Sequence, residues 1–84
     1  MNKCTKIFTI WYNIIIMVFG ERLKELRTER KISQMELAKA TGISQSAIAK
    51  WELGKTEPTA SALIRLSEYF SETVDYLLGI EVNA

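Results

Sequence analysis

The chain has 84 residues, a formal net charge of +1, and a composition that is 48% hydrophobic and 25% charged. This length predicts one small domain with a thin core, and the composition excludes global disorder. The chain has no histidine and a single cysteine, Cys4, which excludes an internal disulfide and the commonest general base and metal ligand. The common phosphate-loop, dinucleotide and nucleophile-elbow motifs are missing as well. We therefore expect a cytoplasmic protein that is not an enzyme and that has no metal, cofactor or small-molecule ligand.

The small net charge hides an uneven distribution along the chain. Residues 21–55 carry eight basic and five acidic side chains, whereas residues 56–84 carry one basic and five acidic side chains. A basic half joined to an acidic half is typical of a protein that presents one face to phosphate groups.

Residues 1–19 differ in character from the rest of the chain. The 13 residues of Ile7–Phe19 are almost all apolar, but a helix that crosses a bilayer needs about 20. The β-branched and aromatic residues of this segment predict a strand or an irregular arm. Three interpretations stay open: a hydrophobic arm that packs on the domain or on a partner, an extension upstream of a start at Met17, or a membrane-associating segment. No role is assigned to residues 1–16.

From Gly20 onward the pattern predicts five short helices. Leu23 and Leu26 lie three residues apart among charged residues, which predicts a first helix over residues 21–30. The sequence S-Q-M-E at 33–36 is a capping box, with Ser33 as the N-cap of a second helix that runs to about residue 41.

The remaining helices also have recognisable ends. Ser44 caps a third helix that runs to about Leu53, a fourth covers about residues 60–70, and Thr73 caps a last short helix that ends at Gly79. The apolar residues expected to face inward are Leu23, Leu26, Leu37, Ala38, Ile43, Ile48, Trp51, Leu63, Leu66, Phe70, Val74, Leu77 and Leu78.

Residues 34–53 have the features of two helices that cross steeply through a tight turn. Ala38 is a small residue where the second helix would cross the first, and Gly42 tolerates the positive φ of the turn. Ile43, Ile48 and Trp51 would anchor the second helix to the core. These spacings predict a helix-turn-helix, with Trp51 in the core and not stacked on a base.

The outward side of the second of these helices is short, polar and nearly uncharged. A glutamine can bridge N6 and N7 of adenine, a lysine can reach O6 and N7 of guanine, and a small alanine allows close approach to the groove. An ordinary solvated helix side carries several Glu–Lys pairs instead. The pattern therefore favours a DNA-recognition surface formed by Gln45, Ser46, Ala49 and Lys50.

Residues 20–79 resemble the Cro/CI-type (XRE-type) helix-turn-helix family. The similarity rests on S-Q-M-E-L-A at 33–38, T-G-I-S-Q-S-A-I-A-K-W-E-L-G-K at 41–55, and D-Y-L-L-G at 75–79. The resemblance implies an all-α, compact five-helix domain of the lambda-repressor type. The hydrophobic extension 1–19 would precede this domain, and a short tail, 80–84, would follow it.

The resemblance also implies roles for individual residues. The implied DNA contacts are Gln34, Ser44, Gln45, Ser46, Ala49, Lys50, Lys55 and Thr56. In the family, a glutamine at the position of Gln34 binds phosphate and braces one at the position of Gln45. The loop at Lys55–Thr56 would bind phosphate through backbone N–H groups and the lysine side chain. Arg27 and Glu52 match a structural ion pair.

We expect a regulator that acts as a homodimer on an inverted repeat in double-stranded DNA, as a repressor. The surface expected to join the two copies is Tyr76, Leu77, Leu78, Ile80 and Val82, although these residues could instead close the core of a monomer. Two alternatives remain: an antitoxin-like module that sequesters a protein and also binds DNA, and a membrane-associated regulator. Duplex DNA is the expected partner, and a membrane is not.

Overall fold

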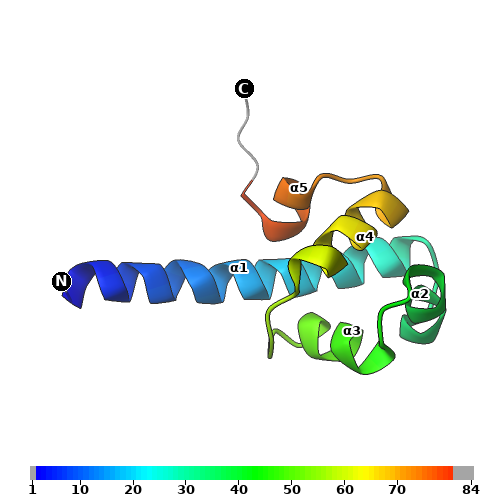
Figure 1. The fold of residues 1–84 in the computed structure, drawn as a ribbon, viewed down its shortest axis with the longest axis horizontal. Helices are drawn as coiled ribbons and strands as arrows, with labels where there is room; N and C mark the ends of the chain where they lie inside the picture. Colours follow the sequence, from blue (N-terminus) through cyan, green and yellow to red (C-terminus); the bar gives the residue numbers. More distant parts are fainter. Residues whose placement is uncertain (1, 81–84) are drawn as a thin grey trace.

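The computed structural model describes the backbone of residues 2–80 and the side chains of residues 9–80. Its five helices are α1 (Asn2–Glu29), α2 (Gln34–Thr41), α3 (Gln45–Glu52), α4 (Ala60–Phe70) and α5 (Val74–Leu78). Figure 1 shows α2 to α5 gathered around the C-terminal half of α1, while its N-terminal half extends away from them. The predicted all-α, five-helix fold is confirmed.

The first helix is much longer than the sequence predicts. We expected a strand or an irregular arm before residue 20 and a helix from residue 21, but α1 runs without a break from Asn2 to Glu29. A helix bonds each backbone N–H to a carbonyl of its own segment, whereas a lone strand leaves its backbone without partners. Because residues 2–80 form no sheet with which this segment could pair, its strand propensity has no effect. No helix within the described residues has both the length and the hydropathy of a membrane span.

The predicted helix ends are present. The Ser33 hydroxyl accepts a hydrogen bond from the Glu36 N–H at 3.0 Å, and the Glu36 carboxylate accepts one from the Ser33 N–H at 2.8 Å, which completes the capping box. Gly42 ends α2 with φ +75°. Ser44 and Thr73 cap α3 and α5 through their hydroxyl groups, as the sequence predicts.

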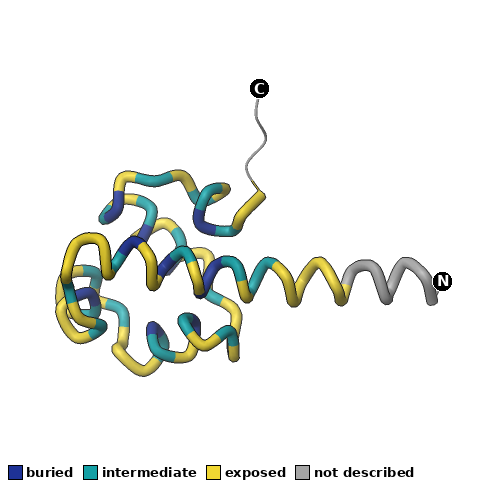
Figure 2. The backbone as a smooth tube through the Cα atoms, turned by 180° about the vertical axis from the view of Figure 1, so that it is seen from behind, coloured by how far each residue is buried: buried dark blue, intermediate teal, exposed yellow. Residues whose placement is uncertain are grey.

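The core lies where the C-terminal half of α1 meets the other four helices (Figure 2). Most of its members are predicted ones, and Ala38, Ile43, Leu63 and Leu78 pack around its edge. Phe19, which we assigned to the extension, is fully buried, and Ala62 is a second core residue that the sequence did not reveal. The buried apolar residues are Phe19, Leu23, Leu26, Leu37, Ile48, Trp51, Ala62, Leu66, Phe70 and Leu77.

Candidate nucleic-acid interface

Two buried side chains fix α3 to the core. Ile48 is fully buried and Trp51 is 5% exposed. The Trp51 ring meets the Phe19 ring edge-on, with centroids 5.9 Å apart, and its Nε1–H donates to the Glu57 carbonyl at 3.2 Å. The prediction that Trp51 is a core residue is confirmed. A ring held in this way cannot stack on a base without leaving the core.

The opposite side of α3 faces solvent. Gln45, Ser46 and Lys50 are exposed, and Ala49 is half-buried between them and the core. Ser44, which precedes them, is exposed, but its Oγ accepts a hydrogen bond from the Ala47 N–H at 3.2 Å and so also closes the helix end. The structure therefore brings these predicted contact residues together on one surface.

The C-terminal end of α3 is joined to α1 by a nearly buried ion pair. Arg27 Nε lies 2.7 Å from Glu52 Oε2 and Arg27 Nη2 lies 3.0 Å from Glu52 Oε1, with the two side chains 13% and 4% exposed. Arg27 Nη1 also donates to the Ile32 carbonyl at 2.8 Å. Hydrogen bonding to Glu52 raises the pKa of the Arg27 guanidinium, although burial acts in the opposite direction. These are the two residues that match the family's structural pair.

Gln34 differs from the expectation. The resemblance implies that it braces Gln45, but its Nε2–H group donates to Glu52 Oε1 at 3.0 Å. Gln34 begins α2 and Glu52 ends α3, so this bond joins the two helices of the motif. The half-buried Gln34 side chain thus joins the Arg27–Glu52 pair and ties three helices together.

The loop after α3 also differs in part. The Lys55 N–H group donates to the Lys50 carbonyl at 2.9 Å, and the Gly54 N–H group donates to the Trp51 carbonyl at 3.0 Å. Since these bonds close the end of α3, the Lys55 amide is not available to a phosphate group. The side chains of Lys55 and Thr56 are exposed. Lys55 can therefore contact a phosphate group through its side chain but not through its backbone N–H group.

A family model described as helix-turn-helix matches residues 23–77. Curated relatives named as HTH-type transcriptional regulators or as phage repressors match 73–81% of the chain. The chain belongs to the Cro/CI-type helix-turn-helix family. It is 43% identical over 65 residues to the HTH-type transcriptional activator BcrR of Enterococcus faecalis. The aligned region is 77% of this chain and 32% of BcrR. It is 41% identical over 61 residues to the repressor protein C2 of Salmonella phage P22. Here the aligned region is 73% of this chain and 28% of that repressor.

The fold agrees with this assignment. The crystal structure of the P22 c2 repressor protein in complex with a synthetic operator superposes with a TM-score of 0.71 at 39% sequence identity, over 76% of this chain and 97% of that one. The chain spans a third to little more than half of the length of the first curated relatives it matches.

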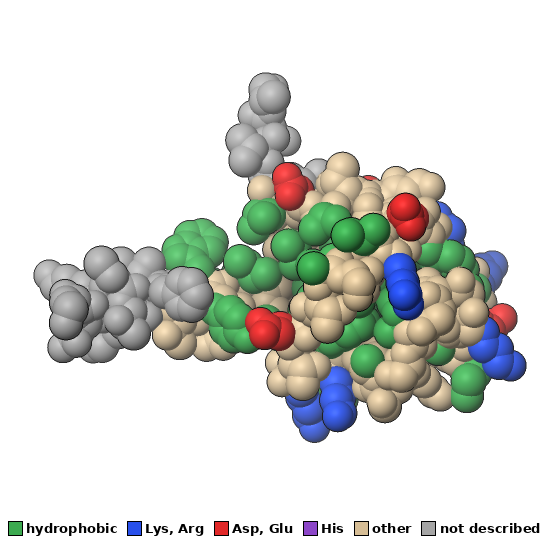
Figure 3. Space-filling model, in the orientation of Figure 1, with side chains coloured by type: hydrophobic (Ala, Val, Ile, Leu, Met, Phe, Trp, Pro, Cys, Tyr) green, Lys and Arg blue, Asp and Glu red, His purple; other side chains and the backbone are tan. Residues whose placement is uncertain are grey.

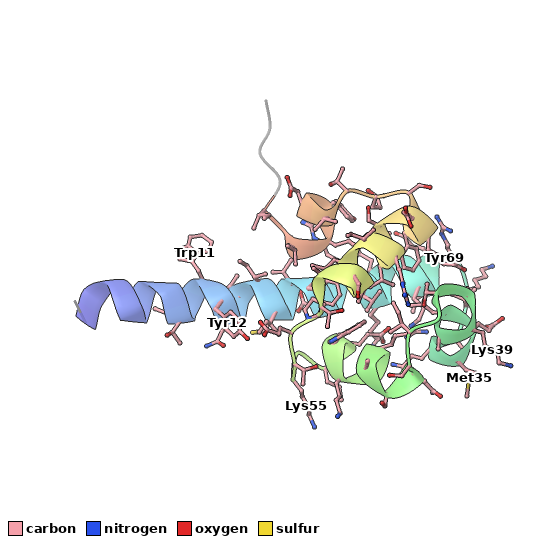
Figure 4. The ribbon with its side chains drawn as sticks, in the orientation of Figure 1. Trp11, Tyr12, Met35, Lys39, Lys55 and Tyr69 are labelled. Atoms are coloured by element: carbon pink, nitrogen blue, oxygen red, sulfur yellow. The ribbon has the colours of Figure 1, made fainter. Side chains whose placement is uncertain are left out.

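One exposed lysine near α3 is not among the predicted DNA contacts. Lys39 is exposed in the last turn of α2. Figure 4 shows Lys55 at one end of the α3 side of the molecule and Lys39 at the other, and Figure 3 shows Lys and Arg side chains at the same two edges. The sequence offered only its place in the basic half of the chain as a signal.

The surface expected to join two copies is smaller than predicted. Leu77 is fully buried in the core, so its side chain is not available to a partner. Tyr76 is half-buried, and the Arg22 guanidinium carbon lies 4.3 Å from the centroid of its ring. Leu78 is half-buried and Ile80 is 43% exposed, whereas Val82 lies outside the described residues.

Proposed function

We propose that this chain is a transcription regulator that binds duplex DNA by placing the outward side of α3 in the major groove. The observation that carries the proposal is the position of Gln45, Ser46 and Lys50, exposed together on a helix that buried residues hold on its other side. Such a helix presents side chains to base edges without having to order itself first. The similarity to a repressor solved with its operator supports this assignment.

A single helix of eight residues reads only a few base pairs. Two copies related by a two-fold axis read twice as many, and place their recognition helices in major grooves about 34–36 Å apart. We therefore propose a homodimer on an inverted repeat, which represses by occupying the promoter. The repressor C2 among the relatives favours repression, whereas BcrR is an activator.

Lys50→Ala is expected to relax base preference at one position of each half-site. The lysine is exposed on the outward side of α3, where it can contact a guanine, and losing such a contact costs about 1–3 kcal/mol of discrimination. Binding to an operator and to its single-base variants, measured by fluorescence anisotropy at one salt concentration, tests this. An unchanged ranking of the variants would remove Lys50 from the recognition surface.

Lys55→Ala is expected to weaken binding to all sequences about equally and to lower the slope of log affinity against log salt by about one. Its side chain is exposed beside α3 and fits a phosphate contact, which fixes register without reading sequence. Lys24→Ala is the matched control, because it removes an equally exposed lysine from α1. If both variants change the salt slope equally, Lys55 makes no specific phosphate contact.

A further inference from the structure

The N-terminal half of α1 presents large apolar side chains to solvent. Ile10, Ile14 and Met17 are 57%, 44% and 58% exposed. They follow one another at spacings of four and three residues and therefore lie along one side of the helix. We call these three residues the apolar strip. From Glu21 onward the same side of α1 is polar, with Lys24 and Thr28 exposed. Ile10 and Ile14 thus lie on the part that extends beyond the other helices, whereas Met17 lies beside Gly54 in the loop after α3.

The other side of this half of α1 is already held by the domain. The Tyr12 hydroxyl donates to Glu57 Oε2 at 2.7 Å, and the loop that carries Glu57 leads from α3 to α4. Figure 4 shows Tyr12 on the side of this loop and Trp11 on the opposite side of α1. The helix is therefore fixed in direction while the strip faces solvent in a single chain.

We propose that the apolar strip packs against the same strip of a second copy of this chain, with the two α1 helices antiparallel. This deepens the dimer of the proposed function by naming its contact, but it rests on the strip and not on DNA binding. The exposed area fits such a contact. Together with the 59% exposed Trp11 beside it, the strip offers several hundred Å² per copy. An apolar patch of this size is often functional, and it could form the apolar centre of an interface that buries about 800 Å² per partner.

The register and the charges favour the antiparallel arrangement. Spacings of four and three let such strips interdigitate, so that Ile10 of one copy lies opposite Ile14 of the other. In the sequence, Lys3 and Lys6 precede the strip, whereas the residues that follow it are mixed in charge: Glu21, Arg22, Lys24 and Glu25. In the register that sets Ile10 opposite Ile14, an antiparallel pair brings position 3 of one copy level with Glu21 of the other. A parallel pair would instead bring the Lys3 and Lys6 positions of the two copies together.

The same pairing places both recognition helices on one face of the dimer. At 100° per residue, Gly20 lies about a quarter turn around α1 from the strip, and α3 packs against Gly20. The two-fold axis of an antiparallel pair is perpendicular to the plane of the two helices, so it keeps α3 on the same side of that plane in both copies. A dimer needs this arrangement to reach one side of a DNA duplex.

The mass of the full chain without DNA tests the proposal, by light scattering after gel filtration at micromolar concentration. We expect twice the 9.6 kDa of one chain for the wild type, and the mass of one chain for Ile10→Glu and for Ile14→Glu. Ile64→Glu is the matched control, because Ile64 is 56% exposed on α4, and it should stay dimeric. Thermal melts by circular dichroism show that the strip variants still fold.

Three results would overturn the proposal. The first is a monomeric wild type, including one that stays monomeric and sediments with vesicles of phosphatidylglycerol and phosphatidylcholine. The second is a dimer that survives both strip substitutions. The third is a dimer that Ile80→Glu breaks and the strip variants do not, which would assign the contact to the C-terminal surface. Because no DNA is present, none of these results depends on whether the chain binds DNA.

Disulfide formation in a Cys4→Ser background tests the orientation. In the antiparallel register, the two copies of residue 17 lie about 15 Å apart along the axis, too far for a disulfide, which needs Cα atoms within about 7 Å. Met17→Cys should therefore stay reduced, whereas a mixture of Ile10→Cys and Ile14→Cys chains should form mixed disulfides. A Met17→Cys disulfide would overturn the antiparallel arrangement.

Discussion

Glu52→Gln is expected to lower the free energy of unfolding by about 3 kcal/mol, because breaking a buried ion pair from one side leaves the other charge without its partner. Glu52 is 4% exposed, and it accepts hydrogen bonds from both Arg27 and Gln34. An amide has the same shape but only one accepting oxygen and no charge. Arg27 would remain at the interface of α1 and α3 as a poorly compensated cation. For a domain of this size, the loss corresponds to a melting temperature lower by more than about 10 °C.

Urea unfolding followed by circular dichroism measures this effect. Glu25→Gln is the matched control, because Glu25 is exposed on α1, and it should change stability by less than about 0.5 kcal/mol. Replacing both partners, Arg27→Met with Glu52→Leu, should recover part of the loss, since it leaves no buried charge alone. Equal stability of Glu52→Gln and Glu25→Gln would show that the ion pair does not hold α3 to α1.

Gly20→Ala is expected to destabilise the fold by about 2–3 kcal/mol. A Cβ at this position would overlap the Trp51 carbonyl oxygen and lie 3.2 Å from its carbonyl carbon. Overpacking usually costs about 1–3 kcal/mol, and the upper end applies here because backbone, and not a flexible side chain, has to move. The Trp51 oxygen cannot move alone, since it also accepts the Gly54 N–H bond that closes α3.

The sign of this effect is informative. Alanine is a better helix former than glycine by about 1 kcal/mol, so helix propensity alone predicts that Gly20→Ala stabilises α1. Lys24→Ala is the control for placing alanine on the exposed side of the same helix, and it should be nearly neutral. The measurement is again urea unfolding. A more stable Gly20→Ala protein would mean that α1 and α3 are not in close contact at this glycine.

The helices from α2 to α5 could be predicted because their signals are local. A capping box at Ser33, a positive φ at Gly42 and a cap at Thr73 each depend on residues within a turn of one another. The spacing of apolar residues in each short helix indicates which side faces inward, and it correctly predicts most of the core residues.

The long first helix could not be predicted in the same way. Gly20 reads as a helix breaker in the sequence, yet the structure uses its missing side chain for the approach of α3, which lies some thirty residues further along the chain. Phe19 is buried for the same reason, because only the fold brings Trp51 against it. The helical conformation of Gly20 and the burial of Phe19 both depend on tertiary contacts, which local propensities do not predict.

In the candidate site too, some features follow from local sequence and others from tertiary contacts. The outward side of α3 follows from helical periodicity, so Gln45, Ser46 and Lys50 could be placed from the sequence. The partner of Gln34 and the use of the Lys55 amide depend on how the helix ends meet in space. The first gives Gln34 a partner that the resemblance does not imply, and the second removes the Lys55 N–H group from the expected phosphate contacts.

Selection of bound duplexes from a random pool by the full chain, at stated salt, tests whether α3 is a recognition helix. We expect an inverted repeat whose half-site centres lie about one helical turn, 10–10.5 base pairs, or a multiple of it apart. The same selection with Gln45→Ala should lose preference at one position of each half-site. If the wild-type chain enriches no sequence, or if Gln45→Ala selects the same sequences as the wild type, α3 is not the recognition helix.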